Sequence, residues 1–175
     1  MTAPAAASPK PHTTLAGAPP TAAALHAGAA GGAPAFSVPV RVYYEDTDAG
    51  GIVYYANWLR YFERARTDWL RALGAAHTRL ADESGLVFVV RDIAVDYHRP
   101  ARLDDLLQVE VRLLEARRAT WTLWQCARLD GHPAALVTAT VRIAAVRRDD
   151  GRPAGIPRWL SARVATPLPQ SPVCG

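Results

Sequence analysis

Three carboxylates and two glycines lie within seven residues, in the segment Glu45-Asp46-Thr47-Asp48-Ala49-Gly50-Gly51. A carboxylate in such a segment can act as a general base or as a nucleophile. The first N–H groups of a helix that begins after it have no partner within the helix, and glycines let a ligand approach them. One such donor stabilises a forming oxyanion by about 3–4 kcal/mol, roughly 10²–10³ in rate. The alternative is an acidic turn in which an Asp caps the helix and the glycines only permit the bend.

Other reactions also use an Asp-x-Asp pair or a glycine-rich loop. The further residues that those reactions need are absent from the relevant positions of this sequence. Phosphatases with an aspartyl nucleophile need a parallel sheet and a cationic partner such as Lys, and the only Lys is Lys10. The same shortage excludes a phosphate-binding P-loop and a pyridoxal Schiff base. None of the serines lies in a G-x-S-x-G motif, which excludes an α/β-hydrolase nucleophile.

The elements that must position the acidic segment follow from hydrophobic spacing. Alternating apolar residues predict a strand over 38–45. Apolar residues then recur every three or four positions from about Val53 to Leu73, which predicts a long amphipathic helix with Gly74 as its stop. One long helix with one sheet and no βαβ alternation predicts an α+β fold. A short helix and four antiparallel strands are expected to follow, at 77–84, 86–97, 106–116, 119–129 and 134–147.

Two sequence blocks carry a resemblance to a known family. The first is Arg41-Val-Tyr-Tyr-Glu-Asp-Thr-Asp-Ala-Gly-Gly-Ile-Val-Tyr-Tyr-Ala-Asn57, continuing into Tyr61-Phe-Glu-Arg-Ala-Arg66. The second runs from Phe88-Val-Val-Arg through Tyr97 to Pro100-Ala-Arg-Leu-Asp-Asp105. Both resemble the Tol-Pal-associated acyl-CoA thioesterases, which belong to the 4-hydroxybenzoyl-CoA thioesterase-like hotdog superfamily. The resemblance covers most of 38–160 and implies a hotdog fold, in which a curved antiparallel sheet of about five strands wraps one long central helix.

The resemblance also implies an activity, the hydrolysis of an acyl-CoA to a carboxylic acid and free CoA. The family's catalytic Asp is here Asp48, which acts as nucleophile on the thioester carbon or as base directing water at it. The backbone N–H of Tyr55 is expected to donate to the thioester oxygen, together with the backbone of Gly50 and Gly51. Close relatives often carry His at the position of Tyr55, so the chain departs from the pattern there, although a backbone donor remains. No cofactor is expected, since coenzyme A is part of the substrate.

Family sites lie at a dimer interface, so the resemblance implies a homodimer or homotetramer whose sheet edges pair. A monomer of five strands would expose such edges, which proteins generally avoid. Val89, Val90 and Arg91, in the second block, would lie near the partner's loop and the acyl–pantetheine tunnel. The anionic nucleotide end of CoA is expected to meet surface arginines, for which Arg117 and Arg118 are the candidates. The alternative is that both are solvated charges at a strand end.

Composition limits the partners, the cellular compartment and the domain organisation that are expected for the chain. The net charge of +4 comes from 19 Arg and Lys10 against 16 acidic residues, and the Arg and acidic residues are interleaved, without the basic runs typical of nucleic-acid binding. Two cysteines, Cys126 and Cys174, indicate a reducing compartment. No apolar stretch approaches the ~18–20 residues of a membrane span. We expect a cytoplasmic protein with a disordered Ala/Pro/Gly-rich extension at 1–35, a thioesterase domain at 36–163 and a flexible tail at 164–175.

Several reactive residue types are expected to be structural. The five His show no metal-ligand spacing, so no metal site is predicted. Cys126 is expected to be a buried small hydrophobe rather than a nucleophile. Glu63 in the long helix is expected to form a surface ion pair with Arg66.

Two other functions remain open. In one, the domain is a binding module that holds acyl groups or acyl carrier protein near lipid-synthesis or envelope machinery, with little turnover. The other is a hotdog dehydratase or hydratase. It fits less well, because such enzymes pair a His with a carboxylate near the helix and no His occurs between His26 and His77. The sequence does not decide the length of the acyl chain, nor between aromatic and aliphatic groups.

Overall fold

The computed structural model describes residues 36–164. The predicted extension at 1–35, and the predicted tail except for Val164, lie outside these residues. The elements in chain order are β1 (Phe36–Arg41), η1 (Tyr44–Asp46), α2 (Asn57–Ala72), α3 (His77–Ser84), β2 (Leu86–Tyr97), β3 (Leu106–Ala116), β4 (Thr120–Leu129), β5 (Ala135–Arg147) and α4 (Arg158–Val164).

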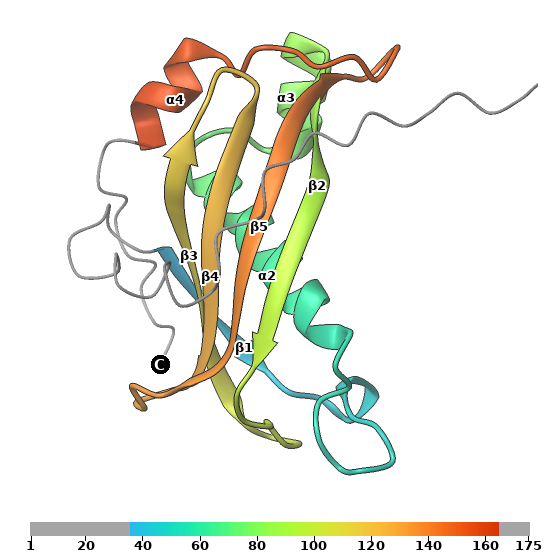
Figure 1. Ribbon diagram of the computed structural model, residues 1–175, viewed down its shortest axis with the longest axis vertical. Coiled ribbons are helices and arrows are strands. Elements are labelled where there is room, and N and C mark those ends of the chain that lie inside the picture. Colours follow the sequence, from blue (N-terminus) through green and yellow to red (C-terminus); the bar gives the residue numbers. More distant parts are fainter. Residues whose placement is uncertain (1–35, 165–175) are drawn as a thin grey trace, which may run out of the picture. The chain divides into compact units, whose positions relative to one another are not determined.

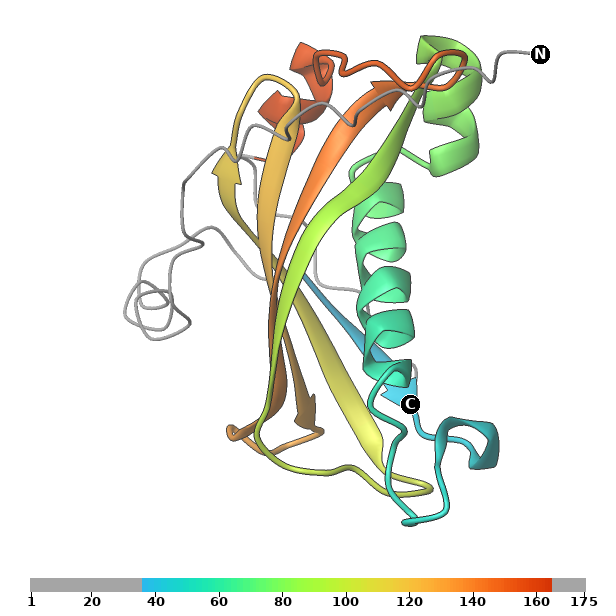
Figure 2. The ribbon, with the colours of Figure 1, turned by 45° about the vertical axis from the view of Figure 1, so that its right-hand side comes forward.

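The strands form one five-stranded antiparallel sheet in the order β1-β3-β4-β5-β2. The curved sheet carries α2 along one of its faces (Figures 1 and 2). The 12-residue strand β2 is an edge of the sheet, and β1 is the other edge. The predicted α+β class and the arrangement of one long helix on a curved sheet are therefore confirmed.

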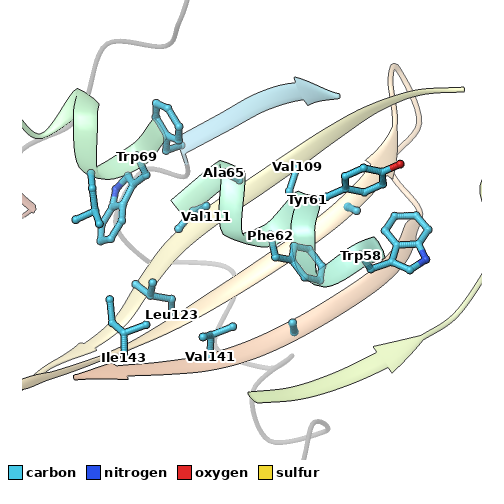
Figure 3. Packing of buried hydrophobic residues seen from close by; sticks show 14 of the residues in the cluster. Trp58, Tyr61, Phe62, Ala65, Trp69, Val109, Val111, Leu123, Val141 and Ile143 are labelled. Carbon is cyan, nitrogen blue, oxygen red and sulfur yellow. The ribbon is translucent and has the colours of Figure 1, made fainter. Parts of the chain in front are cut away.

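The core lies between α2 and the sheet face that it covers. Apolar residues of α2 recur at intervals of three and four, which places them on one side of the helix. Each large side chain that is fully buried contributes about 1.5–3 kcal/mol to folding. Figure 3 shows the two sets that meet: Trp58, Tyr61, Phe62, Ala65 and Trp69 from the helix, and Val109, Val111, Leu123, Val141 and Ile143 from the sheet.

The predicted bounds hold within one residue for α3 and for β2 to β5, but the predicted end of the first strand and the predicted start of the long helix were wrong, and one helix was not predicted. The strand predicted over 38–45 ends at Arg41, and the chain then turns into η1 because the Asp46 carboxylate accepts the Tyr43 N–H at 2.9 Å. The helix expected from about Val53 starts at Asn57. The helix that was not predicted is α4. It follows Pro157 and buries Leu160 and Val164, a pair four residues apart.

Candidate functional site

The two aspartates of the Asp-x-Asp pair lie in different environments. Asp46 is 4% exposed. Its backbone carbonyl accepts hydrogen bonds from the Tyr54 N–H and the Asn57 side-chain amide, both at 2.9 Å. Burial, followed by the nearby Asp46 carboxylate, raises the pKa of the Tyr61 phenol. Asp46 therefore joins the acidic segment to the start of α2, whereas Asp48 is exposed to solvent.

The exposed Asp48 carboxylate is held by the loop that it begins. Its Oδ1 accepts the Gly50 N–H at 2.8 Å, and its carbonyl oxygen accepts the Gly51 N–H at 2.9 Å. A Cβ at Gly50 would come within 3.0 Å of that Oδ1, and Gly51 has φ of +69°. Both positions therefore favour glycine. In this conformation the two glycine amides are directed at Asp48 itself.

Tyr55 lies two residues before α2, in the turn that leads into the helix. Ala56 is the N-cap of α2 and makes no side-chain capping bond. The alternative in which an Asp caps this helix is therefore wrong. The Tyr55 N–H finds no acceptor within residues 36–164. An exposed turn with an unpaired amide is a suitable place for a carbonyl oxygen or an oxyanion to bind.

The second sequence block holds this turn in place. The Val53 N–H donates to Ala101 O at 2.9 Å, and the Val42 N–H donates to Asp105 O at 3.0 Å. The Tyr97 hydroxyl, at the end of β2, donates to Tyr55 O at 3.2 Å. The two blocks that carry the family resemblance thus meet in space around the start of α2.

The rings beside Asp48 form a small electrostatic cluster. The Tyr54 and Tyr55 ring centroids are 4.6 Å apart. The Tyr55 phenol, followed by burial and the Asp48 carboxylate, raises the pKa of Tyr54. Tyr97 also has a raised pKa, through burial and then through Tyr55. The raised pKa values keep the Tyr54 and Tyr97 phenols protonated at neutral pH.

A cavity of about 90 Å³ lies between the C-terminal half of α2, the start of α3 and the first residues of β2. Two predicted substrate-binding residues, Val89 and Val90, line it together with Phe88, Trp69 and Leu70. Asp48 precedes the N-terminus of α2, whereas Trp69 and Leu70 belong to its last turns. Within one protomer the structure therefore does not bring the cavity and the Asp48 loop together.

Polar side chains at the cavity form a chain of hydrogen bonds. The Thr67 hydroxyl donates to Glu63 at 2.7 Å and lies 3.2 Å from His77 Nε2. Thr67 and His77 were not predicted as site residues. Their only signal in the sequence was the spacing of Glu63 and Thr67, which lie one helical turn apart.

Within residues 36–164, Glu63 and Arg66 do not form the surface ion pair that was predicted. Arg66 is 8% exposed, and its guanidinium donates to Gln125 Oε1 at 2.7 Å. The Gln125 amide in turn donates to Phe62 O at 2.9 Å. Burial lowers the pKa of Arg66, and the nearby Glu63 partly offsets this. Arg66 faces the sheet because it lies four residues after Phe62, on the buried side of α2.

The remaining predicted binding residues lie apart from Asp48. Arg91 is exposed and lies at a register shift between β2 and β5, where a bulge turns a side chain out of the regular alternation. Arg117 and Arg118 line a hollow of about 440 Å³ together with Arg158. Arg117 also pairs with Glu115 at 2.8 Å.

Cys126 is buried, as predicted, and burial raises the pKa of its thiol to about 11. This thiol is protonated at neutral pH and is a poor nucleophile. Among residues 36–164, none of the helices combines the length and the hydropathy needed to cross a membrane.

Comparison with known proteins places this geometry in a family. The family model of the thioesterase-like superfamily matches residues 42–164. A Haemophilus influenzae protein named acyl-CoA thioesterase YbgC is 47% identical over 127 residues, which cover 73% of this chain and 92% of that protein. An Escherichia coli protein named acyl-CoA thioester hydrolase YbgC is 49% identical over 82 residues, 47% of this chain and 60% of that protein.

Solved structures agree with the sequence relatives. A probable thioesterase from Bartonella henselae superposes with a TM-score of 0.66 at 36% identity, covering 71% of this chain and all of that one. A hypothetical protein from Aquifex aeolicus superposes with a TM-score of 0.68 at 30% identity, covering 74% and 98%. The chain belongs to the thioesterase-like superfamily, with the hotdog fold. The predicted class of enzyme, a thioester hydrolase, is thereby confirmed.

Proposed function

We propose that the chain hydrolyses acyl-CoA thioesters to a carboxylic acid and free CoA at the loop that carries Asp48. The single observation that carries the proposal is the pairing of an exposed carboxylate, held by the Gly50 amide, with the unpaired Tyr55 amide seven residues later. The names of the relatives from H. influenzae and E. coli support the choice of an acyl-CoA as substrate.

Each group has a defined part in the proposed reaction. As a base, Asp48 takes a proton from the water whose oxygen adds to the thioester carbon; as a nucleophile, its own oxygen adds to that carbon. In either case the thioester oxygen becomes an oxyanion, which the Tyr55 N–H stabilises. The C–S bond then breaks as the oxyanion collapses. On the base route the acid is formed directly, and Asp48 returns its proton to the CoA thiolate. On the nucleophilic route a mixed anhydride remains, and water hydrolyses it to the acid and free Asp48, supplying the proton that the thiolate takes up. Gly50 and Gly51 contribute by fixing the loop, since their amides donate to Asp48.

The active unit in this proposal is a dimer that pairs β2 with β2 of a partner. Edge strands of this length are rarely left unpaired, and Val89, Val90 and Ile93 of β2 are 42%, 50% and 37% exposed. The hydrogen bond from Tyr97 to Tyr55 O places the end of β2 at the Asp48 loop, while the start of β2 lies at the cavity. Antiparallel pairing about the middle of β2 would therefore bring the Asp48 loop of each protomer beside the cavity of the other. A homotetramer would repeat this dimer.

The register of the sheet supports a nucleotide site at Arg117 and Arg118. Val89 lies opposite Ala144, and Ala144 lies opposite Thr120 on its other side. At about 4.8 Å between strands, Val89 and Thr120 are roughly 10 Å apart. The arginines precede Thr120 by two and three residues. A pantetheine arm that starts near Val89 would carry the anionic end of CoA toward this hollow.

The experiment is a free-thiol assay of the purified protein on acetyl-, butanoyl-, hexanoyl-, palmitoyl- and benzoyl-CoA. Saturable thiol release on any of them is expected. Saturable binding without release on every one would instead favour an acyl-binding or acyl-carrier-protein-binding module, and would contradict the proposed hydrolysis.

A further inference from the structure

Resting on the proposed function, we infer that the phenol of Tyr54 is a further catalytic group, which donates a hydrogen bond to the sulfur of CoA as the C–S bond breaks. The proposed reaction assigns the attack to Asp48 and the oxyanion to the Tyr55 N–H. It assigns no protein group to the negative charge that forms on sulfur at that moment. Tyr54 is exposed and lies between Asp48 and Tyr55 along the chain.

A short antiparallel hairpin that precedes α2 positions Tyr54. The Asp48 N–H donates to Ile52 O at 3.0 Å, and the Tyr54 N–H donates to Asp46 O at 2.9 Å. The chain reverses between Asp48 and Ile52, where Gly51 has φ of +69°. Three-residue hairpin loops commonly place their last residue in this left-handed region. The backbone of the hairpin therefore fixes where its side chains point.

The hairpin places Asp48 and Tyr54 on the same face. Thr47 and Val53 form the bridge between the two hydrogen bonds. Because side chains alternate between the faces of a strand, Asp48 and Tyr54 both lie on the face opposite to that pair. Val53 is buried, whereas Asp48 and Tyr54 are exposed, as this alternation requires. Diagonal neighbours on one face are about 7–8 Å apart, within reach of an aromatic side chain.

The electrostatics of Tyr54 agree with this placement. Its ring centroid lies 4.6 Å from that of Tyr55. The raised pKa of Tyr54 has its largest cause in the Tyr55 phenol, with further contributions from burial and from the Asp48 carboxylate. Tyr54 therefore keeps its proton at neutral pH and is a hydrogen-bond donor beside the attacking carboxylate.

The backbone of Tyr54 is held at both of its polar atoms. Its N–H is bonded to Asp46 O, and its carbonyl oxygen accepts the Asn57 N–H at 2.8 Å. The nearby hydroxyl of Tyr97 already donates to Tyr55 O. Tyr54 thus combines a fixed backbone with an exposed phenol, which suits a donor that meets its acceptor as charge develops in the reaction.

The chemistry of the leaving group fits a phenol. The Tyr55 N–H belongs to the peptide that joins Tyr54 to Tyr55, so a thioester whose oxygen binds there has its carbon and sulfur beside Tyr54. When the C–S bond breaks, its electron pair stays on sulfur, and a hydrogen bond to a charged acceptor is roughly twice as strong as a neutral one. Thiols are more acidic than phenols, so Tyr54 keeps its proton. The thiolate then takes up its proton from Asp48 or from water, according to the route.

The test compares leaving groups that are close in size and differ in acidity. For the acyl group that the wild type hydrolyses fastest as a CoA thioester, kcat/KM is measured on the CoA, ethyl and trifluoroethyl thioesters. Trifluoroethanethiolate is a weaker base than ethanethiolate, so it needs less stabilisation as the C–S bond breaks. The full-length wild type is compared with Tyr54→Phe and Tyr55→Phe. The matched control is Tyr43→Phe, because Tyr43 is an exposed tyrosine that precedes the hairpin.

Tyr54→Phe should lower kcat/KM about tenfold to a hundredfold on the CoA and ethyl thioesters, since a hydrogen bond to a charged group is lost. On the trifluoroethyl thioester the loss should be less than threefold. Tyr55→Phe keeps its backbone N–H and should hold the ratio of the ethyl to the trifluoroethyl thioester within threefold of the wild type. Tyr43→Phe should stay within twofold of the wild type on all three substrates.

The outcomes separate this inference from the function on which it rests. Equal losses of Tyr54→Phe on the ethyl and trifluoroethyl thioesters, or losses below threefold on all three, overturn the inference and leave the thioesterase activity standing. A change of the ratio in Tyr55→Phe without one in Tyr54→Phe does the same. Because the ratio is measured within one variant, partial loss of folded protein does not alter it. Absence of thiol release from every thioester by the wild type overturns the proposed function, and this inference with it.

Discussion

The Tyr97 hydroxyl donates a hydrogen bond to the Tyr55 carbonyl oxygen over 3.2 Å. This bond ties the end of β2 to the turn that precedes α2. The Tyr55 N–H, the proposed oxyanion donor, lies one peptide before the carbonyl that Tyr97 holds. The end of an edge strand thereby contacts the turn that carries the proposed donor.

Tyr97→Phe should reduce catalysis more than stability. One neutral hydrogen bond contributes about 0.5–1.5 kcal/mol, so its loss at the turn should lower kcat/KM about threefold to tenfold. Because the bond is exposed, the melting temperature should change by no more than about 2 °C. Tyr44→Phe is the control, since Tyr44 is 82% exposed in η1. An equal loss of activity in both variants would contradict a specific role for the Tyr97 bond.

Substitution of the two aspartates of the Asp-x-Asp pair should affect the stability of the protein to different extents. Asp46→Ala removes a buried carboxylate and leaves the Tyr43 N–H without its acceptor in a partly buried hydrogen bond, which should cost about 1–3 kcal/mol of unfolding free energy in urea titrations. Asp48→Asn keeps an exposed side chain of the same shape and should change stability by less than about 0.5 kcal/mol. Equal costs for the two would show that Asp46 does not hold the segment as described.

A charge in the middle of β2 should separate the protomers. In the proposed pairing, Ile93 lies near the twofold axis, so Ile93→Lys would place two cations together. Sedimentation should then show a monomer, and kcat/KM should fall at least tenfold because the cavity loses its facing Asp48 loop. Pro39→Lys, on the exposed opposite edge β1, is the control. A dimer that survives Ile93→Lys with full activity would argue against pairing through β2.

Stability should fall at alkaline pH through Cys126. Burial raises the pKa of its thiol from 9.0 to about 11. Between these values the unfolded chain has lost the proton and the folded chain keeps it, so the unfolding free energy decreases as pH rises. This difference in pKa contributes about 2–3 kcal/mol to the unfolding free energy. The contribution is present in full below pH 9 and is lost by about pH 11. In urea titrations over this range Cys126→Ala should lose correspondingly less; an identical slope would contradict the assignment.

The sequence predicts those parts of the structure that depend on local spacing. The apolar period places Phe62 and Trp69 on the buried side of α2. The same period also indicates that Arg66 faces inward, although its charge led to the prediction of a surface residue. The contact of Tyr97 with Tyr55 joins residues 42 apart along the chain, and Asp46 is held by Tyr43, Tyr54 and Asn57 in an irregular turn rather than in a regular element. No spacing rule reports such contacts, so the two aspartates look alike until the chain is folded.

The most direct test of the proposed site is kcat/KM for thiol release from butanoyl-CoA by the wild type and by Asp48→Asn. Asparagine keeps the size of the side chain and removes its ability to act as base or nucleophile. We predict a loss of at least about a hundredfold, with unchanged circular dichroism and melting temperature. Turnover by Asp48→Asn within a few-fold of the wild type would contradict the role of Asp48.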